Sequence, residues 1–232
     1  MFIRAAAKRQ VVITLGVHHA PCYFSPVSEI SPAKVFLLSP AFCGGKRAQL
    51  LLSERAAFPL AHRLGQPGGT AIGEVFSFVS GLYFRGKLAY AREFARPPQG
   101  HPASLVITPT RGLVPSDTPV TRDDIVEFAT IDIASDDARF RVPFERDAET
   151  LAARVPGDVV LLGSVATGKY VDVLLALFGA RLLFPLDFVG RGDMSRGGLM
   201  LQRVREGREL HYVPVAGAVR HGPRPPRLTR HR

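Results

Sequence analysis

The segment from Asp158 to Gly179, DVVLLGSVATGKYVDVLLALFG, constrains the fold more than any other part of this chain. A short apolar run is followed by a glycine-bounded loop and then by a longer apolar run. This order is typical of a buried strand, a tight connection and a helix, the repeating unit of α/β proteins. We therefore predict an α/β fold with a mainly parallel, Rossmann-like sheet and helices on both faces.

The loop after this strand has the spacing of a phosphate-binding loop, G-x-x-x-x-G-K. Tyr170 stands where that motif needs the Ser or Thr hydroxyl that ligates magnesium. We interpret the loop as an anion-binding site without ATPase activity and assign no cofactor. The alternative is a tight turn in which the glycines only relieve strain. The anion-binding residues would be Gly163, Ser164, Thr167, Gly168 and Lys169.

Composition limits the class of protein and its partners. The 232 residues suit one large domain, and no apolar run approaches the roughly 18 residues of a membrane span. The excess of 30 Lys and Arg over 20 Asp and Glu gives a formal charge of +10, which favours polyanions such as nucleic acids as partners. A general bias towards arginine is the alternative. Two cysteines make no disulfide framework, so we expect a cytoplasmic protein.

Three parts of the chain differ in composition. Residues 1–33 read as an N-terminal extension, residues 34–220 as a single α/β domain, and residues 221–232 as a basic tail that stays disordered until bound. The extension holds His18, His19 and Cys22. Three ligands at most are too few for a structural zinc site, so we expect no metal.

Periodicity and turn residues predict the elements of the domain. Buried strands are expected from Lys34, Ser104, Asp158 and Arg181, with a last strand in HYVPVAGAV. Helices are expected over residues 49–64, 82–94, 122–129, 144–155 and 195–206, the third of them capped by Thr121.

Glycine and a cation follow four of the expected strands. In a parallel sheet the carboxyl ends of the strands share one edge, where α/β proteins bind their ligands. Lys46, Arg111, Lys169 and Arg191 would then converge on one crevice that suits a phosphate-bearing ligand. For the same reason we expect residues 190–196 to line the crevice with the loop at residues 163–169.

Two residues are candidates for chemistry. Cys43 precedes a helix beside two cations, which would lower its pKa and make it a nucleophile, although a buried spectator cysteine is the alternative. Asp193 either caps the helix that starts near Ser195 or acts as an acid or base.

Short landmarks resemble a known family. Leu38-Ser39-Pro40-Ala41, Ser80-Gly81-Leu82-Tyr83 and the segment from Val159 to Tyr170 resemble, in the same order, the LSPA, SGLY and strand-ending-in-EY landmarks of the bacterial peroxide-stress DNA-binding (YaaA-like) family. TPTRGLVPSDTPVT, which starts at Thr108, is similar to a stretch of the glycosylase-like domain associated with archaeosine synthesis. The resemblance implies a shared α/β scaffold and, more loosely, nucleic acid or modified-nucleobase chemistry.

The functional expectation is a nucleic-acid-associated protein that holds phosphate at the strand-end crevice and acts on or near a nucleobase. One alternative is a metabolic enzyme that binds a free nucleotide or another phosphorylated small molecule. A second is a non-catalytic scaffold that docks through the basic tail. Whether the protein is an enzyme is left open by the residues alone.

Overall fold

The computed structural model describes residues 33–133, 136–165, 168, 170–226 and 228. They belong to the unit that spans Pro32–Arg232. The histidines and Cys22 of the N-terminal extension lie outside the described residues, as do Thr167 and Lys169 of the glycine-bounded loop.

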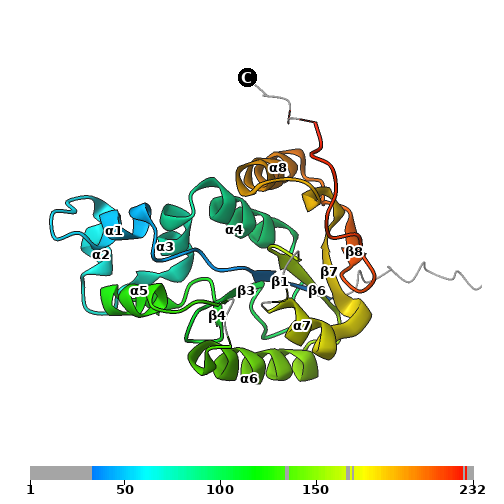
Figure 1. Ribbon diagram of the computed structural model, residues 1–232, viewed down its shortest axis with the longest axis horizontal. Coiled ribbons are helices and arrows are strands. Elements are labelled where there is room, and N and C mark those ends of the chain that lie inside the picture. The colour runs from blue at the N-terminus through cyan, green and yellow to red at the C-terminus, as the bar shows by residue number, and fades with distance from the viewer. Residues whose placement is uncertain (1–32, 134–135, 166–167, 169, 227, 229–232) are drawn as a thin grey trace, which may run out of the picture. The chain divides into compact units, whose positions relative to one another are not determined.

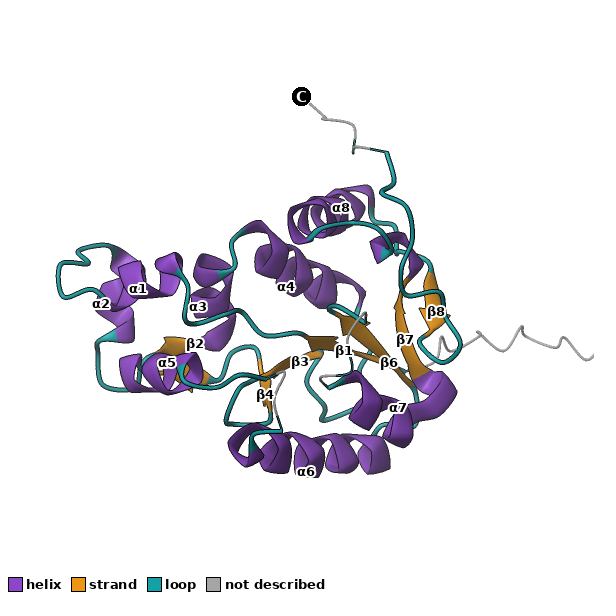
Figure 2. Ribbon diagram, viewed as in Figure 1, coloured by secondary structure: helices purple, strands orange, loops and turns teal. Residues whose placement is uncertain are grey.

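The described chain contains a six-stranded mixed sheet in the order β4-β3-β1-β6-β7-β8 (Figure 2). The four inner strands run parallel, and the edge strands β4 and β8 are antiparallel to their neighbours. The prediction of an α/β protein with a mainly parallel sheet is therefore confirmed. The strands are β1 Lys34–Leu38, β3 Ser104–Ile107, β4 Leu113–Pro115, β6 Asp158–Leu162, β7 Leu182–Pro185 and β8 Tyr212–Pro214, and β2 Thr70–Ala71 pairs separately with β5 Pro119–Val120.

Helices connect the strands (Figure 1). Alternate residues of β1 enter two separate apolar clusters: Phe36 and Leu38 pack with residues of α3, α4 and α8, whereas Val35 and Leu37 pack with residues of α6 and α7. The helices are α1 Lys46–Leu52, α2 Pro59–Leu64, α3 Ile72–Val79, α4 Leu82–Phe94, α5 Arg122–Ala129, α6 Ala138–Arg154, α7 Val171–Phe178 and α8 Asp193–Glu206, with 3₁₀ turns η1 Gly179–Arg181 and η2 Leu186–Phe188.

Several predicted boundaries are wrong for identifiable reasons. The single helix expected over residues 49–64 is two helices, because Pro59 lacks a backbone N–H and stands at the first position of α2. Helix α6 starts at Ala138, six residues before the predicted start, and continues through Pro143 with Asp137 as its N-cap. The prediction for α5 is confirmed, and Thr121 forms a capping box with Asp124.

Helices α4 and α8 approach each other closely at glycines. A Cβ atom at Gly86 would lie 2.7 Å from the carbonyl oxygen of Gly197, and one at Gly197 would lie 2.6 Å from the carbonyl oxygen of Leu82. Side chains larger than hydrogen would separate the two helices. This contact places the first turns of α4 and α8 beside the carboxyl end of β1.

The first half of the tail lies on the domain. Arg191 donates a hydrogen bond to the carbonyl oxygen of Pro226 at 3.3 Å, and Leu228 packs against the cluster that contains α4 and α8. Gly190 has a φ of 72°, and a Cβ atom there would lie 2.1 Å from the carbonyl oxygen of Pro223. The described part of the tail is thus in contact with the domain, which its composition did not indicate.

Candidate functional site

A cavity of about 440 Å³ lies at the carboxyl ends of β1 and β6, and we call it the strand-end cavity. These two strands are neighbours at the centre of the sheet, and the chain leaves β1 towards β3 on one side before it returns to β6 on the other. Such a reversal of strand order is where open α/β sheets bind ligands. Ser39 is the first residue after β1 and Ser164 the second residue after β6, and both line the cavity.

The centre of the site is a serine in contact with a buried lysine. Ser39 follows β1, and its backbone N–H donates to the carbonyl oxygen of Leu162 at 3.3 Å. Lys87, on α4, places its Nζ 2.7 Å from the Ser39 Oγ and 2.9 Å from the Ser39 carbonyl oxygen. Ser39 is 7% exposed and lines the cavity, whereas Lys87 is 1% exposed and lies behind it.

Lys87 has an unusual environment for a lysine. Its Nζ lies 4.0 Å from the ring centroid of Tyr83 and, among the described residues, forms no ion pair with a carboxylate. Burial lowers the pKa of Lys87 to about 7; the charge of Asp193 opposes this shift and that of Arg196 adds to it. A substantial fraction of Lys87 is therefore a neutral amine near neutral pH, and a neutral amine can accept a proton.

Tyr83 and Tyr170 also line the cavity. The Tyr83 hydroxyl is buried and forms no hydrogen bond of good geometry among the described residues, although the Arg196 side chain lies near enough to oppose the rise in its pKa. The Tyr170 hydroxyl donates a long bond, 3.4 Å, to the carbonyl oxygen of Ser164 and also interacts with the side chain of Ser39. Burial raises the pKa of both groups, that of Tyr170 to about 12, so both remain neutral donors. A buried hydroxyl without a hydrogen bond of good geometry is the kind of group that a ligand would satisfy.

Gly163 makes room for this cluster. A Cβ atom at Gly163 would lie 2.8 Å from the Ser39 Cβ, 2.9 Å from the Tyr170 hydroxyl and 3.0 Å from the Ser39 Oγ. The backbone at the end of β6 therefore lies so close to Ser39 and Tyr170 that only the hydrogen of a glycine fits between them. The first glycine of the loop has a steric role at the site whether or not the loop binds an anion.

Replacing Gly163 with alanine should displace Ser39 and Tyr170 and reduce the free energy of unfolding by about 1–3 kcal/mol, the usual cost of overpacking. Chemical denaturation measures the loss. Gly198→Ala is the control, because a Cβ atom there meets only the end of the Leu228 side chain, at 3.4 Å. That change should be neutral or stabilising, since alanine favours helix. Equal stability of the two variants would contradict the crowding at Gly163.

Two cations are also among the residues around the cavity. Lys46 and Arg47 begin α1 and line the cavity. Within the described ranges neither forms an ion pair, and Arg47 donates only to the carbonyl oxygen of Phe78, at 3.2 Å. The guanidinium of Arg47 lies against Gly81, where a Cβ atom would be 2.3 Å from its NH1 atom and where φ is 64°. Glycine at position 81 thus admits both the backbone conformation and the cation.

Asp193 also lines the cavity, and of the two roles considered for it the helix cap is not observed. Gly192 is the N-cap of α8 and Asp193 the first helical residue, without a side-chain capping hydrogen bond. Its carboxylate lies 3.8 Å from Arg196, and its side chain is 69% exposed. The cavity brings Asp193 together with Ser164, as expected from the adjacency of β6 and β7.

Two other predicted site residues, Arg111 and Arg191, lie outside the strand-end cavity. Arg111 forms an ion pair with Asp124 and joins the turn after β3 to α5. Arg191 donates to Asp187, Ser195 and Pro226 and lines a different cavity beside the tail. The expected convergence of Arg111 and Arg191 with Lys46 in the strand-end cavity is therefore wrong.

Cys43 is buried beside a separate cavity of about 400 Å³. Burial raises the pKa of its thiol to about 12, opposite in direction to the lowering that the neighbouring cations suggested. The thiol is protonated at neutral pH, so the buried spectator is the reading that its surroundings favour.

The loop after β6 is only partly described. Ser164 lines the cavity and Gly163 lies against Ser39 and Tyr170, whereas a Cβ atom at Gly168 would lie 2.5 Å from a carboxylate oxygen of Asp172. That carboxylate, in the first turn of α7, would repel an anion bound at Gly168. Thr167 and Lys169 lie outside the described residues, and their predicted role in binding an anion stays a prediction.

The sequence reasoning did not single out Ser39, Tyr83, Lys87 or Tyr170 as site residues. A signal for Lys87 exists in the pattern of α4, because the buried positions Tyr83, Leu88, Ala91 and Phe94 place residue 87 on the apolar stripe. A lysine on that stripe must bury its amine. Burial of an amine without a carboxylate partner is costly, and this makes it a candidate functional group.

Comparison of this chain with protein-family models, with curated proteins and with solved structures finds no match. In the described ranges no helix is both long and apolar enough to span a bilayer. The same ranges contain no cluster of three or more histidine, cysteine or acidic side chains that could hold a metal ion.

Proposed function

We propose that the protein is nucleic-acid-associated and binds a phosphate-bearing group in the strand-end cavity. The observation that carries this proposal is that Lys46 and Arg47, which form no ion pair within the described residues, line a cavity at the carboxyl ends of the two central strands. Cations held without carboxylate partners attract phosphate, and the formal charge of +10 adds a long-range attraction for a polyanion.

Two further arguments support the same reading. Helices pack in two clusters against the largely parallel sheet, as in Rossmann-like proteins, which bind nucleotides where this cavity lies. The three landmarks that resemble the peroxide-stress DNA-binding family also meet here, since Ser39, Tyr83 and Tyr170 line one cavity. The hydroxyls of these residues are suited to contact a base or sugar while the cations contact phosphate.

A second candidate function is the binding of a free nucleotide or another phosphorylated small molecule. The volume of the cavity favours it, because about 440 Å³ lies within the usual range of small-molecule sites. The two functions differ in their dependence on ligand length. A polynucleotide should bind more tightly as it lengthens over the basic surface, whereas a mononucleotide should saturate the cavity by itself.

Lys46→Ala should weaken the binding of a single-stranded oligonucleotide about 5-fold to 100-fold, as expected for the loss of one charge-assisted hydrogen bond. It should also reduce the slope of log K against log salt by about one unit. Fluorescence anisotropy between 50 and 300 mM salt, roughly the range where counterion release dominates, measures both quantities.

The control is Arg92→Ala, which removes the same charge from the exposed last turn of α4, away from the cavity. If the two variants lose affinity equally, the cavity has no special part in binding. Protection by a mononucleotide in thermal unfolding, with no gain in affinity on lengthening the ligand, would instead support the small-molecule function.

A further inference from the structure

We propose that Ser39 is a nucleophile and Lys87 its general base, and that the strand-end cavity carries out acyl transfer on an ester or amide. The inference rests on the proposed function only because both place a ligand in this cavity. It adds a reaction class that anion binding does not require.

The geometry of the pair supports these roles. The Lys87 Nζ is 2.7 Å from the Ser39 Oγ, within the distance at which a base accepts the proton of a nucleophile. Its second contact, 2.9 Å to the Ser39 carbonyl oxygen, fixes the direction of the amine. Paired serine and lysine are an established alternative to the serine, histidine and aspartate triad.

The positions of the two side chains assign the roles between them. Ser39 borders the cavity, whereas Lys87 is 1% exposed and does not line it. A substrate can therefore reach the serine oxygen but not the lysine nitrogen. This arrangement fits a base behind a nucleophile and does not fit a lysine that forms a Schiff base with the substrate.

The charged and titratable groups around the amine keep it available as a base. Tyr83 comes from α4, Asp193 and Arg196 come from α8, and Ser39 follows β1. The opposite charges of Asp193 and Arg196 partly cancel at the amine, so burial dominates and lowers the pKa of Lys87 to about 7. At neutral pH a large share of the molecules holds the neutral base.

A structural role alone does not account for the lysine. A methionine or leucine at this position of α4 would fill the same space as the aliphatic part of the lysine side chain. Either residue would also avoid the cost of burying an amine without a carboxylate partner. Tyr83 lines the same cavity, and its hydroxyl is buried beside Arg196 without a hydrogen bond of good geometry in the described part of the chain.

The reaction balances without a cofactor. The Ser39 Oγ attacks the carbonyl carbon of the substrate while its proton moves to the Lys87 Nζ. When the tetrahedral intermediate collapses, the bond from carbon to the leaving oxygen or nitrogen breaks and Lys87 returns the proton to the leaving group. Water then attacks the acyl ester on Ser39, Lys87 accepts and returns a proton, and the carboxylic acid is released with Ser39 restored.

The test uses the full chain and two small probes. A fluorophosphonate should label the wild-type protein once, on the peptide that contains Ser39, as located by mass spectrometry. p-Nitrophenyl acetate should give a burst of nitrophenol from acylation. Ser39→Ala should abolish both, and Lys87→Met should slow both by roughly 100-fold or more, the usual contribution of a general base.

The control is Ser53→Ala, which alters a serine outside the cavity, at the end of α1, and should leave labelling unchanged. Melting temperatures establish that each variant is folded. In the wild-type protein the labelling rate should also rise with pH through about 7, the pKa of Lys87, and this readout needs no variant.

The outcomes separate this inference from the proposed function. Labelling on another residue, labelling that survives Ser39→Ala, or no labelling and no burst in folded protein would overturn it, even if oligonucleotides bind. Hydrolysis of p-nitrophenyl phosphate without a burst from p-nitrophenyl acetate would overturn the assignment of acyl transfer as the reaction. Labelling of Ser39 in a protein that binds no phosphate ligand would support the inference and remove the proposed function.

Discussion

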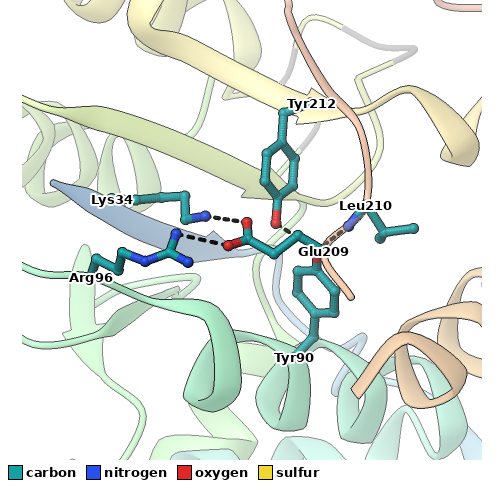
Figure 3. A network of polar contacts seen from close by, with 6 residues as sticks. All are labelled: Lys34, Tyr90, Arg96, Glu209, Leu210 and Tyr212. Carbon is teal, nitrogen blue, oxygen red and sulfur yellow. Dashed lines mark hydrogen bonds and ion pairs between the residues drawn. The ribbon is translucent and has the colours of Figure 1, made fainter. Parts of the chain in front are cut away.

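Replacing Glu209 with alanine should lower the free energy of unfolding by about 2–4 kcal/mol, somewhat less than the loss of one partner from a fully buried ion pair, because the Glu209 side chain is 24% exposed. Glu209 lies between α8 and β8 and forms ion pairs with Lys34 and Arg96 (Figure 3). Lys34 begins β1 and its side chain is 8% exposed, so without Glu209 its amine would be buried without a carboxylate partner. Thermal or urea unfolding at pH 7 measures the loss.

The surroundings of Glu209 explain why the loss should be large. Backbone hydrogen bonds join Lys34 and Arg96 in both directions, at 2.7 and 2.9 Å, and hold β1 against the end of α4. Beside them, the Tyr90 hydroxyl lies 2.5 Å from the Tyr212 hydroxyl and accepts a bond from the N–H of Leu210 at 2.7 Å (Figure 3). Glu209 therefore anchors the segment between α8 and β8 to the start of β1.

Arg96→Ala is the matched control, because it removes the other cation that contacts Glu209. The Arg96 side chain is 49% exposed, and exposed ion pairs contribute only about 0–1 kcal/mol. A similar loss for both variants would show that the carboxylate acts through the surface pair and that the buried lysine contributes little.

Acid should remove the contribution of Glu209. Burial alone would raise the pKa of this carboxyl, but its bonds to Lys34 and Arg96 outweigh burial and hold the pKa below its ordinary value. The folded state then binds its proton later than the unfolded state, so the stabilisation is complete above about pH 4.5 and disappears as the pH falls through the folded pKa. The difference between the wild type and Glu209→Gln should shrink over that range.

Local patterns predict the sheet well because its inner strands are buried on both faces. Runs such as KVFLL and DVVLL are nearly all apolar, which distinguishes them from loops and amphipathic helices. The order of the strands and the two antiparallel edges depend on contacts between distant segments, which periodicity does not encode. The pairing of β8 with β7, for example, brings Tyr212 beside Pro185.

The site is less predictable because its central contact joins residues 48 positions apart. Ser39 and Lys87 meet only after α4 packs against β1 and α8, and that packing depends on the contact between Gly86 and Gly197. The sequence shows that cations follow the strands, but it does not show which way their side chains point. Lys46 faces the cavity, whereas Arg111 is paired with Asp124 on another part of the surface.

Replacing Lys87 with methionine should change how stability depends on pH. The folded pKa is about 7 and the ordinary value is 10.5, so between these values the unfolded chain binds a proton that the folded chain does not. The free energy of unfolding of the wild type should therefore rise with pH relative to Lys87→Met, by about 1.4 kcal/mol per pH unit. Below pH 7 the protonated lysine imposes the full penalty, and Lys87→Met should be the more stable protein by several kcal/mol.

Urea unfolding at pH 6, 7, 8 and 9, roughly the window between the two pKa values, measures the difference between the two proteins. Buried groups with raised pKa values, such as Cys43 and Tyr170, are present in both and cancel. Ser39→Ala is the control, because it keeps Lys87 buried and should show the same pH dependence as the wild type. A difference that stays constant from pH 7 to 9 would mean that Lys87 is charged in the folded protein. A charged amine has no lone pair to accept the proton of Ser39, so this measurement of stability also decides whether the pair can act as nucleophile and base.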